Sequence, residues 1–546
     1  MASAGRCRTD RSDHDLRLEA QLRSDSLGRF RPHLVTIAAF AIAAAWLAFR
    51  ALAALPNHDE SQYVAASVLS RDQLIFRDFL SLQPPLHAWL MAPVAWLFAG
   101  DSFVALRLTS AAMGVATLLL LHGALRAMNV TAASALAATL LMACCEAFQF
   151  AGTIVRNDMA PAMMLTAAML AAMVAIRRQS AAPWPAVGLL LGLAASAKLS
   201  YGPPLAFAGL FVLVQVARGN LPRSVLFGFA GAAAAGLLPM LAGFLVDREA
   251  FLYGTLEFGA TAPFDWYRAN GLGYRLEWPG KLTDFLRYAA LGPALPALAI
   301  VAWDVATRRP PHSPAALQRR WLCGMLLAGI AAALLPTPIQ RQYLLPMLPP
   351  LFALLAPALD RLASAPRRWR APVQALLALT ALFGFAKGAV TLANGADDPA
   401  ALEIDRQAEW IGRELRMHGL HGEIASLSPE RIASSGYKID ERFAAGPFAF
   451  RSGNLLDPAR ARAIDTATPE TLAEDFDRDP PVAILTGYER GSRRFRLAPD
   501  KPLIAYARLR GYRPVLLPDR IGTLYIRAGH VRAKMPSPLG NLTKIK

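Results

Sequence analysis

An acidic pair follows the first long apolar run of this chain, in the segment Pro56-Asn57-His58-Asp59-Glu60-Ser61-Gln62-Tyr63. A charged side chain left in membrane hydrocarbon costs at least about 2.5–3.5 kcal/mol, so two carboxylates beside a span are notable. Asp59 and Glu60 would lie at the water-facing edge, where a general base for a membrane-bound substrate should stand. The alternative is a solvated loop start, and position alone does not separate the two interpretations.

Further acids, cations and hydroxyls stand at or near the ends of other apolar runs. They are Asp78, Asp158, Arg156, Lys198, Arg341, Tyr63 and Tyr343. A carboxylate can accept a proton from an acceptor hydroxyl, and cations can stabilise the charge that develops on a leaving phosphate. These residue types, on one side of a membrane, predict group transfer from a lipid-phosphate donor.

Each of these residues also has an ordinary interpretation. Lys198 and Arg341 could extend their charged ends to the membrane interface without binding a ligand. Arg156 and Asp158 could form a local ion pair, which contributes little when it is exposed. His87, in the segment Gln83-Pro84-Pro85-Leu86-His87, could be an ordinary polar residue.

The elements that must position these residues are membrane spans. The chain has 546 residues, of which 54% are hydrophobic, and a mean hydropathy of +0.31, values typical of a polytopic helical membrane protein. Runs close to the length of about 20 residues that a spanning helix needs recur along it. We expect eleven, at 33–55, 103–125, 131–151, 159–176, 184–199, 202–217, 224–246, 285–305, 321–337, 342–359 and 371–392.

The net charge of +17 follows the topology and does not indicate nucleic-acid binding. Arginines cluster in alternate loops, in the N-terminal arm and then around Arg126, Arg177, Arg218, Arg308 and Arg361. The positive-inside rule places these loops in the cytoplasm. We therefore expect the N-terminus inside, and the Asp59 loop and everything after residue 392 outside. The four cysteines show no metal-ligand spacing and are expected to be packing residues.

The expected domains follow from this pattern. Residues 1–32 form a cytoplasmic arm, 33–392 the transmembrane domain with a long first outer loop at 56–102, 393–533 an outer α/β domain, and 534–546 a basic tail. In the outer domain we expect helices at 403–417, 469–476 and 503–510, and strands at 423–427, 482–486, 514–517 and 523–527.

The ordered motifs resemble those of the GT-C membrane glycosyltransferases. The acidic pair after the first span is accompanied by Gln83-Pro84-Pro85-Leu86, Arg156-Asn157-Asp158, Ala195-Ser196-Ala197-Lys198 and the run from Arg341 to Pro349. The set covers about residues 1–390 in order. It is most similar to the bacterial branch related to protein O-mannosyltransferases and the lipid A aminoarabinose transferase.

The resemblance implies an inverting transfer of a monosaccharide from a polyprenyl-phosphate donor. Asp59 would be the base, Glu60 its support, and Asp158 a second acid lining the cavity. Lys198, Arg341 and Arg156 would bind the donor phosphate beside Tyr343, with Tyr63, Asp78 and His87 as candidate sugar or acceptor contacts. The acceptor would be lipid A or its core, another envelope glycan or a protein, at the outer face of a bacterial inner membrane, with the enzyme acting as a monomer. No cofactor is expected, and the spacing of His and acidic residues does not support a metal site.

Two other classes of protein remain open. A transporter or flippase of lipid-linked sugars would carry charges in mid-span and broken helices in paired repeats. A non-catalytic membrane scaffold would bind partners through its outer domain, and would leave the acidic pair without a task.

Overall fold

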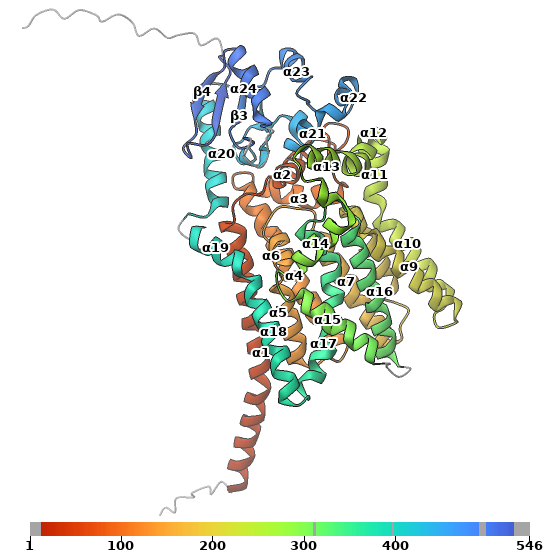
Figure 1. The fold of residues 1–546 in the computed structure, drawn as a ribbon. Coiled ribbons are helices and arrows are strands. Elements are labelled where there is room, and N and C mark those ends of the chain that lie inside the picture. The colour runs from red at the N-terminus through yellow and green to blue at the C-terminus, as the bar shows by residue number, and fades with distance from the viewer. Residues whose placement is uncertain (1–12, 309–312, 396–397, 491–497, 529–546) are drawn as a thin grey trace, which may run out of the picture.

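The computed structural model describes residues 13–308, 313–395, 398–490 and 498–528, and side chains from residue 33 onward. A bundle of helices carries a separate C-terminal domain at one end, and α1 projects from the opposite end (Figure 1). The helices of the bundle are α1 (Asp13–Ala53), α4 (Ser102–Ala127), α5 (Ala132–Ala143), α7 (Met159–Arg178), α8 (Trp184–Ala197), α9 (Gly202–Ala217), α10 (Arg223–Gly236), α11 (Leu238–Val246), α14 (Trp278–Ala289), α15 (Ala294–Thr307), α16 (Pro314–Leu334), α17 (Leu348–Ala363), α18 (Arg367–Gly384) and α19 (Ala386–Gly395).

The polytopic helical architecture is confirmed, but fewer helices have the length and composition of a span than the sequence pattern implied. Within the described ranges, 6 single segments are long and apolar enough to cross a membrane, or 8 if the pairs α10–α11 and α14–α15 each count as one bent span. The bend is 40° in the first pair and 98° in the second. Every expected run contains helix, but α5, α8 and α16 do not add to these candidates. A total of eleven spans therefore stays a prediction.

Small residues allow helices of the bundle to approach closely. A Cβ atom added at Gly188 or Gly192 of α8 would lie only 2.3 or 2.5 Å from a carbonyl oxygen of α10. Gly236 makes the reciprocal contact, 2.5 Å from the carbonyl oxygen of Leu189. Such small-residue interfaces hold membrane helices together, because lipid offers no hydrophobic drive for association.

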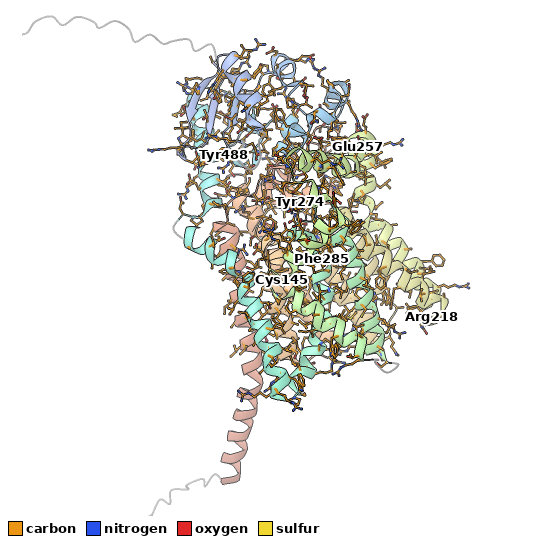
Figure 2. All side chains as sticks on the ribbon, in the orientation of Figure 1. Cys145, Arg218, Glu257, Tyr274, Phe285 and Tyr488 are labelled. Carbon is orange, nitrogen blue, oxygen red and sulfur yellow. The ribbon has the colours of Figure 1, made fainter. Side chains whose placement is uncertain are left out.

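Short helices fill the end of the bundle that faces the C-terminal domain. They are α2 (Glu60–Leu69), α3 (Leu86–Leu97), α6 (Glu146–Ala151), η1 (Leu199–Tyr201), α12 (Arg248–Leu252), the π-helical turn η2 (Tyr253–Glu257), α13 (Phe258–Ala269), η3 (Gly273–Leu276) and η4 (Arg341–Met347). Glu257 lies at this end, whereas Arg218 lies at the far tip of the α9–α10 hairpin (Figure 2). The turn between α17 and α18 lies at the end opposite the C-terminal domain (Figure 1). Arg361 in the last turn of α17 and Arg367 at the start of α18 flank it, as the charge pattern predicts.

The C-terminal domain is α/β, as expected. Its five strands are β1 (Glu423–Ser426), β2 (Lys438–Ile439), β3 (Ala483–Thr486), β4 (Arg513–Leu516) and β5 (Thr523–Ile526), in the order β2-β1-β3-β5-β4. β1 runs parallel to β2 and β3, whereas β5 is antiparallel to β3 and β4. The helices are α20 (Ala400–Met417), α21 (Pro447–Arg451), α22 (Pro458–Ala463), α23 (Leu472–Arg478) and α24 (Asp500–Leu509), with 3₁₀ turns η5 (Pro429–Arg431), η6 (Glu441–Phe443) and η7 (Gly453–Leu455). The expected basic tail at 534–546 lies outside the described residues.

The domain is docked on the bundle by polar as well as apolar contacts. The buried carboxylate of Asp405 on α20 accepts hydrogen bonds from the amides of Phe103 (3.3 Å) and Val104 (2.9 Å), at the start of α4. Ser434 donates to the same carboxylate at 2.5 Å and accepts from the amide of Ser102 at 2.9 Å. These bonds satisfy amide groups that a helix start leaves without intrahelical partners, so the two parts share a rigid joint.

Candidate active site

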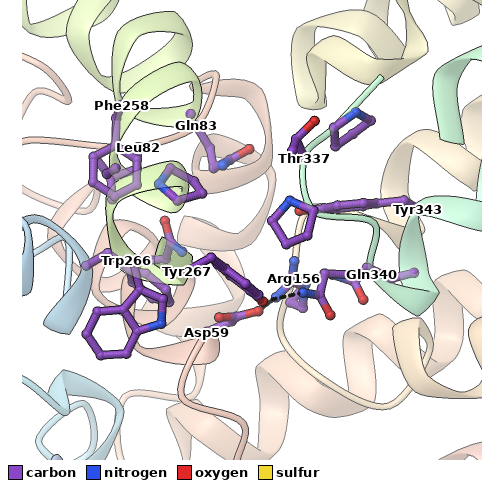
Figure 3. A pocket seen from close by; sticks show the side chains of 18 of the residues that line it. Asp59, Leu82, Gln83, Arg156, Phe258, Trp266, Tyr267, Thr337, Gln340 and Tyr343 are labelled. Carbon is purple, nitrogen blue, oxygen red and sulfur yellow. Dashed lines mark hydrogen bonds and ion pairs between the residues drawn. The ribbon is translucent and has the colours of Figure 1, made fainter. Parts of the chain in front are cut away.

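A cavity of about 1070 Å³ lies between the short helices of the bundle and the C-terminal domain. Its wall comes from residues within the segments 57–63, 82–84, 198–200, 254–288, 335–343 and 448–452, together with Phe150, Arg156, Glu489, Arg490 and Pro499. Asp59 and Arg156 meet near its centre, with Trp266 and Tyr267 of α13 on one side and Gln340 and Tyr343 on the other (Figure 3). Residues from both ends of the chain therefore build one compartment.

Asp59 is held at the N-cap position of α2, in contact with the cavity. Its amide donates to the side chain of Asn57 at 3.0 Å, which fixes the tight turn before the helix. One carboxylate oxygen forms an ion pair with Arg156, and the other lies 3.2 Å from Nε2 of His58. Burial, with nearby Arg451 and Arg156, lowers the pKa of His58 to about 4. His58 is therefore neutral near pH 7, so its contact with Asp59 is not an ion pair between two charged groups.

Glu60 points away from the cavity into a fully buried ion pair. Arg107 of α4 donates to its two oxygens at 2.8 and 2.6 Å. The amides of Asn57 (2.8 Å) and Val155 (2.9 Å) complete the carboxylate's shell. Glu60 thus ties the loop before Asp59 to α4 and to the segment before Arg156, which suits a positioning residue and not a proton acceptor.

Asp158 lies one layer behind the cavity wall and joins two of the expected phosphate-binding cations. It accepts a hydrogen bond from Nε of Arg156 at 2.9 Å and forms an ion pair with Lys198. The lining includes both cations but not Asp158, because its carboxylate is 2% exposed beneath them. The structure thus places Asp158 behind the lining, and its predicted part in the site stays a prediction. Nζ of Lys198 lies 4.8 Å from the ring centre of Tyr343, so four of the predicted residues form one cluster.

Arg341 enters the cavity from η4 and is held from behind. Its Nη1 donates to Glu146 at 2.8 Å, and its guanidinium carbon lies 3.5 Å from the ring centre of Phe150. Arg50 of α1 also pairs with Glu146, at 3.4 Å. Two cations around one carboxylate leave an excess positive charge beside Arg341, which favours a negatively charged ligand.

Of the three candidate sugar or acceptor contacts, one lines the cavity and two do not. Tyr63 lines the cavity and donates to Asn157 at 3.0 Å. His87 is buried behind Tyr63, with ring centres 5.6 Å apart, and is not part of the lining. Asp78 is also outside the lining, because it pairs with Arg77 at 2.7 Å and caps the amide of Leu74 at 2.7 Å. In the structure His87 makes packing contacts and Asp78 makes loop-stabilising contacts, and ligand contacts by either residue stay a prediction.

Sequence reasoning missed several residues that the structure brings to the site. Arg50 and Arg107 support it from inside apolar runs, where a charge is itself a functional signal. Arg451 and Glu489 of the C-terminal domain line the cavity, and no local pattern identified them as part of the site. The charged lining residues are seven cations (Arg156, Lys198, Arg275, Arg287, Arg341, Arg451, Arg490) and three acids (Asp59, Asp284, Glu489).

A metal site is not evident in this arrangement. Over the parts of the chain that the structure describes, no three His, Cys, Asp or Glu side chains are grouped so that they could hold a metal ion. Action without a metal stays a prediction.

Comparison with known proteins shows what the chain is similar to. Residues 82–242 match the family described as dolichyl-phosphate-mannose-protein mannosyltransferase, and no curated protein matches the chain. The structure of ArnT from Cupriavidus metallidurans bound to undecaprenyl phosphate is similar over 90% of this chain and 98% of that chain, with 14% identity and a TM-score of 0.53. The apo state of that protein gives the same coverage and identity, with a TM-score of 0.51.

A more distant similarity is to the S. cerevisiae protein O-mannosyltransferase Pmt1-Pmt2 complex bound to the sugar donor. It has 21% identity and a TM-score of 0.27 over 45% of this chain and 36% of that chain. The shared fold rests on ArnT, and the family signature rests on residues 82–242. The predicted resemblance is thereby confirmed: the chain has the polytopic helical fold of ArnT, and residues 82–242 carry the signature of the mannosyltransferase family.

Proposed function

We propose that this protein transfers a monosaccharide from a polyprenyl-phosphate donor to an acceptor of the bacterial envelope, with Asp59 as the general base. The observation that carries the proposal is that Asp59 shares one cavity with Arg156, Lys198, Arg341 and Tyr343. A base and several phosphate-binding cations within reach of one ligand are what this transfer requires. Undecaprenyl phosphate bound to ArnT, a protein of the same fold, supports the choice of donor.

The reaction follows from the placement of these groups. The acceptor hydroxyl gives its proton to Asp59 while its oxygen forms a bond to the anomeric carbon of the sugar. The bond from that carbon to the donor phosphate oxygen breaks, and its electron pair stays on the lipid phosphate. Lys198, Arg156 and Arg341 stabilise the charge that develops there. Attack opposite to the leaving group inverts the anomeric carbon.

The remaining acids act through their neighbours. Glu60 holds the turn that presents Asp59, through its bonds to Asn57 and Arg107. Asp158 holds Arg156 and Lys198 side by side beneath the cavity wall. Since Asp158 neutralises only part of that positive charge, the two cations can still receive a phosphate.

The setting proposed for this reaction is the outer face of a bacterial inner membrane. The arginine-rich turn between α17 and α18 lies at the end opposite the cavity, which supports a cytoplasmic position for that end. The acceptor is proposed to be an envelope glycolipid such as lipid A or its core, another glycan, or a protein.

Replacement of Asp59 by Asn tests the assignment. The variant should lose about 100- to 10,000-fold in transfer from a radiolabelled polyprenyl-phosphate sugar to isolated envelopes, because a general base contributes this much. Asp72→Asn is the matched control, since Asp72 is another acid of the first outer loop, 71% exposed and absent from the cavity. Transfer by the Asp59→Asn variant at the rate of the control would remove Asp59 as the base.

Two further measurements distinguish an enzyme from a flippase or a scaffold. Loss of the gene should remove one envelope modification and cause the donor lipid to accumulate, and the purified protein should release free lipid phosphate in step with transfer. A flippase would move the donor without releasing that phosphate.

A further inference from the structure

Arg451 of the C-terminal domain faces the cavity in an unusual environment. Its guanidinium carbon lies 4.1 Å from the ring centre of Trp266 and 4.6 Å from that of Phe448. Trp266 belongs to α13 and Phe448 to α21, so the guanidinium is held where the two parts of the protein meet. Aromatic faces orient a guanidinium and leave its N–H groups available in the plane.

The other cations of the proposed donor site form ion pairs with carboxylates, whereas Arg451 forms none with a described side chain and interacts with Glu489 only at a longer distance. Arg156 pairs with Asp59 and Asp158, Lys198 with Asp158, and Arg341 with Glu146. No described side chain forms an ion pair or a hydrogen bond with Arg451. A partly buried guanidinium without a counter-ion favours the binding of an anion, and its fork of N–H groups matches a phosphate or a carboxylate.

The position of Arg451 relative to Asp59 gives this binding a role. One oxygen of Asp59 meets Arg156, on the side of the proposed donor phosphate. The other meets His58 at 3.2 Å, and the ring of His58 lies 5.4 Å from that of Phe448, which contacts Arg451. Arg451 is therefore linked, through Phe448 and His58, to the oxygen of Asp59 that does not meet Arg156. We expect an acceptor hydroxyl to reach Asp59 at this oxygen.

Glu489 in the same part of the wall does not oppose this role. Burial, together with Glu430 and Asp500, raises the pKa of Glu489 to about 8, although the positive charge of Arg451 lowers it. Near pH 7 the carboxyl group is therefore largely protonated, and it can donate a hydrogen bond to an anion without repelling it. Arg451 remains charged, since burial lowers its pKa only to about 10.

We propose that Arg451, held between Trp266 and Phe448, forms an acceptor subsite that binds an anionic group, a phosphate or a carboxylate, on the molecule that receives the sugar. The inference rests on the proposed transfer and specifies the chemical class of its acceptor. It also assigns the C-terminal domain a direct part in acceptor recognition.

Binding of small anions to the full-length protein in detergent tests the subsite. Undecaprenyl phosphate is first added to saturation to occupy the donor cations, and inorganic phosphate or acetate is then titrated by calorimetry. The wild-type protein should bind one of the two, and Arg451→Gln should weaken that binding by roughly 10–100-fold, the range for a lost charge-assisted hydrogen bond. Preference for phosphate or for acetate indicates which anionic group the acceptor carries.

The control variants separate recognition from folding. Arg268→Gln removes an exposed arginine that also contacts a ring of α13, 6.0 Å from the centre of Phe264, but lies outside the cavity lining, so it should bind anions like the wild type. Arg451→Lys keeps the charge and the apolar stem and should retain part of the affinity. In envelope assays, Arg451→Gln should lower transfer while undecaprenyl phosphate binds as before.

Two failures have different meanings. If the wild-type protein with bound lipid takes up neither anion, or if Arg451→Gln takes it up equally well, the subsite is refuted. If undecaprenyl phosphate itself does not bind and Asp59→Asn transfers sugar normally, the proposed function is refuted, whatever Arg451 does.

Discussion

The buried pair of Arg107 and Glu60 should decide whether the turn before Asp59 stays in place. Arg107 donates to Glu60 at 2.8 and 2.6 Å and to the carbonyl oxygens of Ala51 (3.0 Å), Ala54 (2.6 Å) and Leu55 (3.3 Å). Arg107→Met removes all five bonds and leaves a buried carboxylate whose only remaining donors are two amides. We expect a loss of about 3–5 kcal/mol, the usual cost of removing one partner of a buried pair.

A loss of that size is a large part of the roughly 5–15 kcal/mol that typically stabilises a folded protein. It should appear as a clearly lower midpoint of thermal unfolding in detergent. The double variant Glu60→Met/Arg107→Met removes the unpaired charge and should recover much of the lost stability. It should not recover transfer activity, because Asn57 and Val155 have then lost the carboxylate that fixes the turn before Asp59.

Unfolding and transfer activity of these variants can each contradict the roles given to Arg107 and Glu60. If the free energy of unfolding of Arg107→Met lies within about 1 kcal/mol of the wild-type value, the ion pair does not contribute the stability expected of it. If the double variant transfers sugar at the wild-type rate, Glu60 has no positioning role. Arg126→Met is a suitable control, because Arg126 also lies on α4 but at its opposite end, away from the cavity.

Two further predictions concern the C-terminal domain. Since the pKa of Glu489 is raised to about 8 from 4.5, the folded state keeps a proton that the unfolded chain releases, so stability should fall as the pH rises from about 5 to 8, by up to about 1.4 kcal/mol per pH unit. Glu489→Gln should flatten this fall in unfolding measured across that range, and an unchanged slope would contradict the assignment. Asp405→Ala should cost about 0.5–2 kcal/mol as a lost helix cap, and limited proteolysis should then cleave faster between α19 and α20, while an unchanged rate would show that the joint does not depend on this carboxylate.

The helices and most strands of this protein were predictable from the sequence, because apolar runs and turn residues are visible within short segments of the chain. Apolar runs marked the helices of the bundle, and the C-terminal strands β1, β3, β4 and β5 lie within a residue of the expected bounds. The two-residue strand β2 was missed, since Lys438–Ile439 is too short to show a period. The common cavity of Asp59, Lys198 and Arg341 was also predictable, because all three stand at helix ends on the same expected side.

The partners of these residues were not predictable, because pairing depends on contacts distant in sequence. Nothing local to Glu60 shows that Arg107 turns it away from the cavity, and nothing local to Asp158 shows that it lies beneath Arg156 and Lys198. The contact of Arg451 with Trp266 depends on how the C-terminal domain docks on the bundle, through α20 and α4. No sequence pattern indicates this docking.

The composition of the cavity wall also bears on how the protein is made. Asp59 leaves the ribosome early, the donor cations follow from residue 156 to residue 341, and Arg451 and Glu489 arrive near the end. The compartment is therefore complete only after the last helix has been inserted and the domain after it has folded. A chain that ends before Arg451 would therefore carry Asp59 and the donor cations but lack the part of the cavity wall that the C-terminal domain supplies.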